Sequence, residues 1–308
     1  MKEVKNMNLT YNEFLVLTTM LRAGKKLSQR DLSSVTDLSL GTINKVVGDL
    51  ASKGCIDSDG FINETGIEAL EPYKVKRAIF LAAGFGSRMV PVTLNTPKPM
   101  VLVNGKRIIE TLLDAVVDAG IEDIIIVTGY LSEQFELLLK KYPNIKFVYN
   151  EKYNEANNIS SAYLVKDKFA NAYVLESDLL LYNKDLIRPY EYQSNFLGKY
   201  VDVTDDWCLE SKNGIITKEK IGGYNCHQML GISYYSASDA PQMEKDLEMV
   251  YNSPGGKEKY WEQVFLDVCK DHYKIAIREC HEGDIIEIDT FNELKQIDPS
   301  YDKVYVKK

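Results

Sequence analysis

The sequence predicts an α/β protein in two parts: a small α+β domain at residues 1–72, then a larger domain at residues 73–308 built on a largely parallel sheet. Two observations support this division. Helical periodicity dominates the first part, whereas short apolar runs alternate with helix-length segments in the second. The pair Glu71-Pro72 marks a linker between them. Strands separated by helices of this length indicate parallel pairing, with helices on both faces of the sheet.

The first domain carries the signals of three short helices and a hairpin. Apolar side chains recur at helical spacing, and Ser28 and Ser39 each stand where a helix would need an N-cap. Ser58-Asp59-Gly60, between two apolar pairs, indicates a tight turn. The expected elements are helices at 11–21, 28–35 and 39–54 and a hairpin at 55–62. This order resembles the winged helix-turn-helix of transcription regulators.

In the second domain, strand-like segments alternate with segments of helical periodicity. Its expected elements are strands at 78–82, 123–128, 146–149 and 172–175, with helices at 108–119 and 132–141. Ligands of such sheets bind beyond the carboxyl ends of the strands. The loops that follow Ala82, Thr128 and Leu175 are therefore expected to meet at one site.

A turn of small residues follows the first of these strands, over Ala83-Gly84-Phe85-Gly86-Ser87. Such a turn lets backbone N–H groups approach a polyphosphate closely. The guanidinium group of Arg88 can donate paired hydrogen bonds to phosphate oxygens. Lys98, in Thr96-Pro97-Lys98-Pro99, adds a positive charge on a flexible side chain. The pattern is neither the dinucleotide fingerprint nor the Walker motif, because the third glycine of the former and the Gly-Lys-Ser/Thr of the latter are missing.

At this spacing the whole run resembles the L-A-A-G-x-G-x-R…P-K signature of sugar-phosphate and phosphocholine nucleotidyltransferases. The resemblance extends from about Lys76 to the C-terminus. It implies a Rossmann-like nucleotidyltransferase fold (GT-A-like, with a mixed sheet) and an enzyme that transfers CMP from CTP to phosphocholine. The nucleotide-binding residues that it implies are Leu81, Ala82, Ala83, Gly84, Gly86, Ser87, Arg88, Lys98, Gly129, Tyr130 and Asn158.

The resemblance also implies two acidic positions that hold Mg²⁺. These are Asp178, just past the strand at 172–175, and Asp289 in Glu287-Ile288-Asp289-Thr290. Mg²⁺ is commonly bound by one or two carboxylates together with substrate phosphates and water. The attacking phosphate is already an anion, so the reaction needs positioning and charge neutralisation more than a general base. Lys98 and Arg88 are the expected catalytic residues.

Aromatic residues are abundant in the part that should cover the acceptor, and the chain has 20 tyrosines. Aromatic faces hold a quaternary ammonium through cation–π attraction. The expected acceptor-binding residues are Ser161, Trp207, Tyr234, Trp261 and Glu262. Phosphoethanolamine, 2-aminoethylphosphonate and a sugar phosphate stay open as acceptors, and first principles leave the base preference open as well.

Composition narrows the choice of partners. A net charge of −8 argues against nucleic acid as the main partner. The first domain has nearly balanced basic and acidic residues, so DNA binding is less favoured than docking or dimerisation.

Apolar runs are too short for a membrane span, and five cysteines without a C-x-x-C pair suggest reduced thiols in a cytoplasm. A homodimer is left open.

A second interpretation makes the chain a transcription regulator whose transferase-like domain senses a nucleotide or phosphocholine. The intact set of Arg88, Lys98, Asp178 and Asp289 argues against such an inactive sensor.

Overall fold

A computed structural model describes residues 7–304, so the first six residues of the first predicted domain and the last four of the second lie outside the described part. The chain forms two compact units. The first comprises the described residues up to Lys74 together with Tyr190–Tyr192, and the second comprises the rest. Among residues 7–304, none of the helices combines the length and apolar character that crossing a bilayer requires.

Three helices of the first unit confirm the sequence prediction. They are α1 (Tyr11–Ala23), α2 (Gln29–Thr36) and α3 (Leu40–Ser52). Ser28 and Ser39 cap the last two, each accepting a hydrogen bond from a backbone N–H three residues on. The expected hairpin is reduced to a single antiparallel bridge between Ile56 and Ile62.

The first unit also contains two elements that the sequence patterns did not predict. Asn63 caps a fourth helix, α4 (Glu64–Leu70), and the expected linker forms a 3₁₀ turn, Glu71–Tyr73. Tyr192 packs in this unit, with its ring stacked on Tyr73 at 5.4 Å between centroids. The resemblance to a winged helix stays a prediction.

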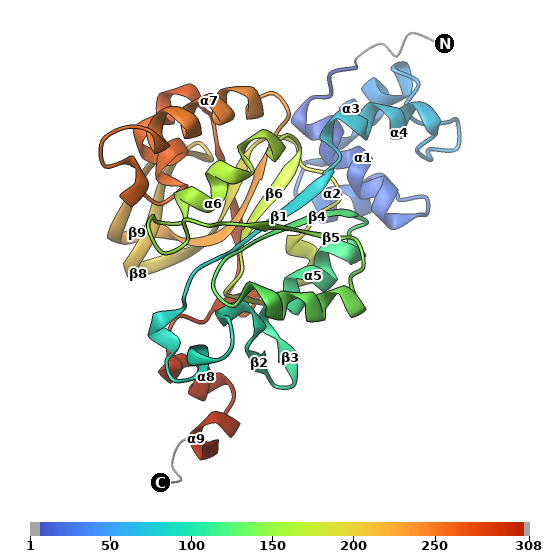
Figure 1. The fold of residues 1–308 in the computed structure, drawn as a ribbon. Helices are drawn as coiled ribbons and strands as arrows, with labels where there is room; N and C mark the ends of the chain where they lie inside the picture. Colours follow the sequence, from blue (N-terminus) through green and yellow to red (C-terminus); the bar gives the residue numbers. More distant parts are fainter. Residues whose placement is uncertain (1–6, 305–308) are drawn as a thin grey trace. The chain divides into compact units, whose positions relative to one another are not determined.

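The second unit is built on a seven-stranded mixed sheet in the order β10-β8-β9-β6-β1-β4-β5 (Figure 1). Its strands are β1 (Arg77–Ala82), β4 (Asp123–Thr128), β5 (Ile145–Tyr149), β6 (Ala172–Glu176), β8 (Asn195–Lys212), β9 (Ile215–Tyr235) and β10 (Ala276–Cys280). β6, β1, β4 and β5 run parallel, as predicted. β9 runs antiparallel to β6 and β8, which makes the sheet mixed.

Alternate side chains of β1 enter two different cores, as the period of two in a strand requires. Phe80 packs in the core that includes α5 (Ile108–Asp118), whereas Ile79 packs with α6 (Ile159–Leu164) and α7 (Ala240–Tyr251). Figure 1 shows α5 on one side of the sheet and α6 and α7 on the other. The segment expected as a helix at 132–141 is instead a 3₁₀ helix, Ser132–Lys140.

Smaller elements complete the second unit at the carboxyl ends of the parallel strands. β7 (Leu179–Leu181) pairs antiparallel with β11 (Ile285–Glu287), and β2 (Leu102–Val103) pairs with β3 (Lys106–Arg107). After β11 the chain forms two short helices, α8 (Phe291–Ile297) and α9 (Ser300–Val304). The β7–β11 pair brings a late segment of the chain back beside the end of β6.

Candidate active site

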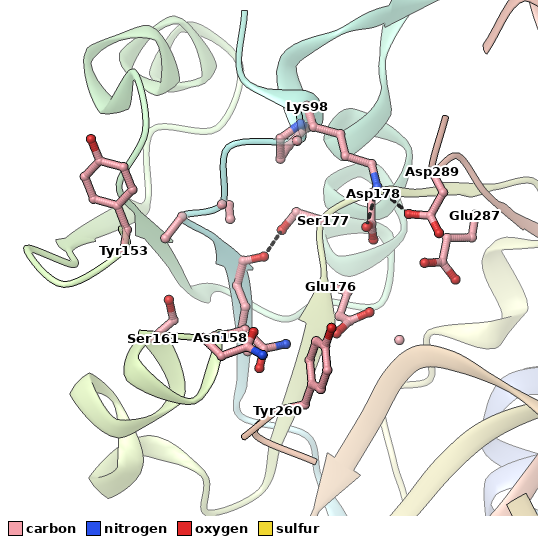
Figure 2. Close-up of a pocket in the computed structure, with 18 of the residues that line it drawn as sticks. Lys98, Tyr153, Asn158, Ser161, Glu176, Ser177, Asp178, Tyr260, Glu287 and Asp289 are labelled. Carbon is pink, nitrogen blue, oxygen red and sulfur yellow. Dashed lines mark hydrogen bonds and ion pairs between the residues drawn. The ribbon is translucent and has the colours of Figure 1, made fainter. Parts of the chain in front are cut away.

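A cavity of about 590 Å³ opens at the carboxyl ends of β1 and β6. Both strands end in residues that line it, and the loops after them form much of its wall (Figure 2). The predicted site residues found in its lining are Leu81, Ala82, Ala83, Gly84, Gly86, Ser87, Arg88, Lys98, Asn158, Ser161, Asp178, Trp207, Glu262 and Asp289. The parallel strands therefore gather most of the predicted site in one place.

The turn after β1 depends on Gly86, which adopts a left-handed conformation with φ of 62°. A Cβ atom at this position would lie 2.8 Å from Cβ of Lys98. Thr93 holds the turn from the other side, since its hydroxyl donates to the Gly86 carbonyl at 2.9 Å. Only glycine combines this conformation with so close an approach to Lys98.

Gly129 and Tyr130 are not among the residues that line the cavity, and they support its turn instead. The backbone N–H of Tyr130 donates to the carbonyl of Ala83 at 3.1 Å. Its hydroxyl donates to the carbonyl of Thr93 at 2.9 Å. A Cβ atom on Gly129 would lie 2.8 Å from the Ala83 oxygen, so the absence of a side chain lets the two loops touch.

Lys98 is the centre of an ion-pair cluster. Its side chain is largely buried, and Nζ lies 2.8 Å from Oδ2 of Asp178 and 2.9 Å from Oδ1 of Asp289. Arg88 reaches the same Asp289 oxygen at 2.7 Å. Burial lowers the pKa of Lys98, but the two carboxylates outweigh burial and raise it, so the ammonium stays charged.

Strand pairing explains why Asp178 and Asp289 meet although they lie far apart in the sequence. Asp178 lies between β6 and β7, and its carbonyl accepts a hydrogen bond from Ile288 N–H at 3.1 Å. Asp289 lies two residues beyond the end of β11, and Glu293 of α8 accepts its backbone N–H at 2.8 Å. Hydrogen bonds to their backbone groups thus hold both aspartates in the lining of the same cavity.

Two further carboxyl groups, Glu176 and Glu287, line the cavity beside these aspartates. Oxygen atoms of Glu176, Asp178 and Glu287 all lie within 4.8 Å of one another. Burial, then the charge of Glu262, raises the pKa of Glu176 well above its usual range. Burial, then the charge of Asp178, does the same for the pKa of Glu287.

Neither of these glutamates was predicted as a site residue. Each stands two residues before a predicted aspartate, and a strand period of two places residues at i and i+2 on the same face. That spacing was the available signal.

The far end of the cavity is aromatic and acidic. Trp207 and Tyr260 meet edge to face with ring centroids 5.7 Å apart, and both line the cavity beside Asp206. Glu262 is almost fully buried there, and burial raises its pKa to about 8. This end can accept an organic cation against ring faces and carboxyl groups.

Tyr234 and Trp261, both predicted to bind the acceptor, lie outside the cavity lining, which corrects that prediction. Trp261 is 1% exposed and packs in the core with Phe169 and Phe265, at 6.2 Å between centroids in each case. Tyr234 is buried too, and its hydroxyl donates to Oδ1 of Asn171 at 3.1 Å. The neighbours of Trp261 in sequence, Tyr260 and Glu262, face the cavity instead.

Asn158 and Ser161 line the cavity from the start of α6. Oδ1 of Asn158 accepts the backbone N–H of Trp261 at 2.9 Å, which ties the loop at residues 260–262 to this helix. Asn150 donates to the hydroxyl of Ser161 at 3.0 Å. These contacts connect the loop after β5 with the aromatic end of the cavity.

Comparison with known proteins places this site in a family. The profile of the Nucleotidyl transferase family matches residues 77–206. A 2-aminoethylphosphonate cytidylyltransferase from Lancefieldella rimae is 36% identical over 231 residues, which cover 73% of this chain and 92% of the relative. The chain belongs to the nucleotidyltransferase family. A choline-phosphate cytidylyltransferase from Streptococcus pneumoniae is 34% identical over 224 residues, covering 72% of this nucleotidyltransferase and 96% of the relative.

A solved structure supports the same assignment for the fold. The nucleotidyltransferase resembles the CTP:phosphocholine cytidylyltransferase of Streptococcus pneumoniae with a TM-score of 0.68 and 32% identity. The match covers 74% of this chain and 99% of that one. The chain therefore has the Rossmann-like nucleotidyltransferase fold with a mixed sheet, as predicted.

Proposed function

We propose that this nucleotidyltransferase transfers CMP from CTP to a small phosphorylated or phosphonate amine and releases pyrophosphate, with Mg²⁺ as its cofactor. The observation that carries the proposal is the meeting of Asp178, Asp289 and Lys98 in a cavity that also contains the turn after β1. The names of the two curated relatives, which specify choline phosphate and 2-aminoethylphosphonate, support both the nucleotide and the class of acceptor.

Asp178 and Asp289, which line the cavity beside Lys98, suit a magnesium ion. Oδ1 of Asp178 is buried and has no hydrogen-bond partner among the described residues. Carboxylate oxygens are the ligands that Mg²⁺ prefers, and it usually takes only one or two of them beside phosphates and water. Asp178 and Asp289 would hold the ion, which supplies positive charge against the phosphates of the nucleotide.

The remaining chemistry belongs to the chain's own side chains. An oxygen of the acceptor's phosphate or phosphonate attacks the α-phosphorus of CTP and forms a new P–O bond. The bond from that phosphorus to the bridging oxygen breaks, and pyrophosphate leaves with the electron pair. No proton has to be removed from the attacking oxygen, because it is already anionic. Lys98 and Arg88 stabilise the charge that develops on the phosphoryl oxygens.

The aromatic end of the cavity supports an acceptor with a cationic head group. Trp207 and Tyr260 present ring surface, and Asp206 and Glu262 supply carboxyl groups within the same lining. A sugar phosphate has no positive charge for these carboxyl groups and ring faces to attract. We therefore place phosphocholine and 2-aminoethylphosphonate ahead of phosphoethanolamine and sugar phosphates, following the names of the curated relatives.

The test is a pyrophosphate-release assay that crosses CTP, UTP, GTP and ATP with these four acceptors. We expect release only with CTP and a phosphorylated or phosphonate amine, and loss of release in EDTA. Lys98→Ala should lower kcat by about two orders of magnitude, because its charge acts mostly in the transition state. Equal rates with a sugar phosphate, or an unchanged kcat in Lys98→Ala, would refute the proposal.

A further inference from the structure

Phe85 is an unusual residue for its position. It lies between Gly84 and Gly86 in the turn after β1, where small and polar residues are the ordinary choice. Its side chain is 46% exposed, and it belongs to none of the apolar cores formed by residues 7–304. Neither turn geometry nor core packing therefore explains a phenylalanine at this point.

Its ring contacts two tyrosines from other loops. The centroid of Phe85 lies 4.9 Å from that of Tyr130 and 5.3 Å from that of Tyr153, both with tilted ring planes. Tyr130 follows β4 and Tyr153 follows β5. The three rings thus connect the loops after three neighbouring parallel strands.

Both tyrosines are themselves held in place. Tyr130 donates hydrogen bonds from its backbone N–H to Ala83 and from its hydroxyl to Thr93. Tyr153 packs so closely over Gly129 that a Cβ atom there would lie 2.7 Å from the Cβ and Cγ atoms of Tyr153. A ring fixed on two such partners restrains the backbone that carries it.

The turn needs this restraint. A Cβ atom on Gly84 would have no neighbour within 4 Å, and glycine loses more conformational freedom on ordering than any other residue. A turn that is free in solution must be ordered when a ligand binds, and that cost is taken from the affinity.

We propose that Phe85 is a positioning residue of the nucleotide site, whose ring anchors residues 83–86 on Tyr130 and Tyr153 so that their backbone amides point at the polyphosphate. The inference rests on the proposed function only in taking a nucleotide polyphosphate as the ligand of this turn. Phe85 itself need not touch the ligand.

The test measures binding of inorganic tripolyphosphate in the presence of Mg²⁺, by calorimetry, on the full chain. We expect Phe85→Ala to raise Kd about tenfold, in the range that the loss of two aromatic contacts allows. Phe85→Tyr keeps the ring and should bind as the wild type does. Tyr224→Ala is the matched control, because Tyr224 is the most exposed large apolar residue of the described chain, at 79%.

Hydrogen exchange measured by mass spectrometry separates anchoring from general stability. Faster exchange in Phe85→Ala, confined to residues 83–88 and the loops at 129–130 and 150–153, is the expected result. Wild-type affinity in Phe85→Ala would overturn the proposal. Faster exchange throughout the second unit would overturn it too, because Phe85 would then be a general structural residue.

Tripolyphosphate contains no nucleobase, and its binding requires no acceptor substrate. The affinities of the wild type and Phe85→Ala can therefore be compared even if the CTP assay gives no turnover. A wild-type chain that binds tripolyphosphate without using CTP would refute the proposed function and leave the role of Phe85 measurable. A wild-type chain that does not bind tripolyphosphate would overturn the inference itself.

Discussion

A methyl group on Gly86 would lie 2.8 Å from Cβ of Lys98, closer than unbonded carbon atoms approach. The stem of Lys98 is thus packed directly against the backbone of the turn that follows β1. The position of the ammonium that Asp178 and Asp289 share therefore depends on the conformation of that turn.

Gly86→Ala should therefore reduce kcat/KM for CTP by tenfold or more. The new Cβ must displace Lys98, and alanine disfavours the positive φ of this position. Gly48→Ala, in α3 and outside the cavity, is the control, because nothing lies within 4 Å of its Cβ position and its φ is not in the left-handed region. Steady-state kinetics on both variants would check this, and equal losses in the two would contradict it.

Asp178→Asn should lower turnover by about two to three orders of magnitude, comparable to removal of an oxyanion donor. The substitution keeps the shape of the side chain but removes the charge that pairs with Lys98 and that the proposed magnesium ion would need. Asp185→Asn, an exposed aspartate after β7, is the control. Circular dichroism and kinetics in a Mg²⁺ series provide the measurement. A near wild-type rate would show that Asp178 does not hold the metal.

The two tryptophans should respond to substitution in different ways. Trp207→Ala removes a ring from the cavity wall, so KM for a cationic acceptor should rise about fivefold to tenfold with little change in KM for CTP. Trp261→Ala empties a core position and should lower the free energy of unfolding by about 3–5 kcal/mol. Acceptor kinetics and urea denaturation on both variants test the distinction. A selective rise in acceptor KM for Trp261→Ala would contradict the buried position.

Use of a cationic acceptor should improve as pH rises through 8. Burial raises the pKa of Glu262 to about 8, so the carboxyl is mostly neutral at pH 7 and becomes charged only above that value. A charged carboxylate attracts the ammonium, and kcat/KM for the acceptor should therefore increase between pH 6.5 and 8.5. Glu262→Gln should flatten this rise while leaving the pH profile for CTP unchanged. The same slope in wild type and variant would exclude Glu262 as its source.

The first unit should be dispensable for transfer. Every residue that lines the cavity belongs to the second unit. A chain beginning at Val75 should retain turnover within about twofold, once Tyr190 and Tyr192, which pack with the first unit, are replaced by serine to keep it soluble. The same two substitutions in the full chain are the control. If the truncated chain has a turnover more than tenfold below that of the full chain with the same two substitutions, the first unit contributes to catalysis.

The parallel half of the fold and the end of the cavity that contains the turn after β1 were predictable, because both depend on local signals. A buried strand followed by glycines, and an aspartate just past a strand end, indicate position without tertiary information. The β8–β9 ribbon was not predicted. Much of it is polar and exposed, and its register shifts around Thr204 and Trp207 break the alternation that marks a strand.

The choice between neighbouring aromatic residues was also beyond the sequence. Tyr260 and Trp261 are adjacent, and only the backbone of that loop decides which ring enters the core. Trp261 was expected in the cavity, but Tyr260 occupies the wall and Trp261 completes a core with Phe265. Large aromatic residues suit both places, so composition does not separate them.

The stacking of Tyr73 on Tyr192 has a consequence for synthesis on the ribosome. A nascent chain that ends at Lys74 has all the helices of the first unit, yet it lacks Tyr192, which completes the aromatic cluster with Phe14 and Tyr73. That tyrosine is translated only after β1, β4, β5 and β6 have been made. The first unit therefore cannot be completed until Tyr192 has been translated, although all of its helices lie before Lys74.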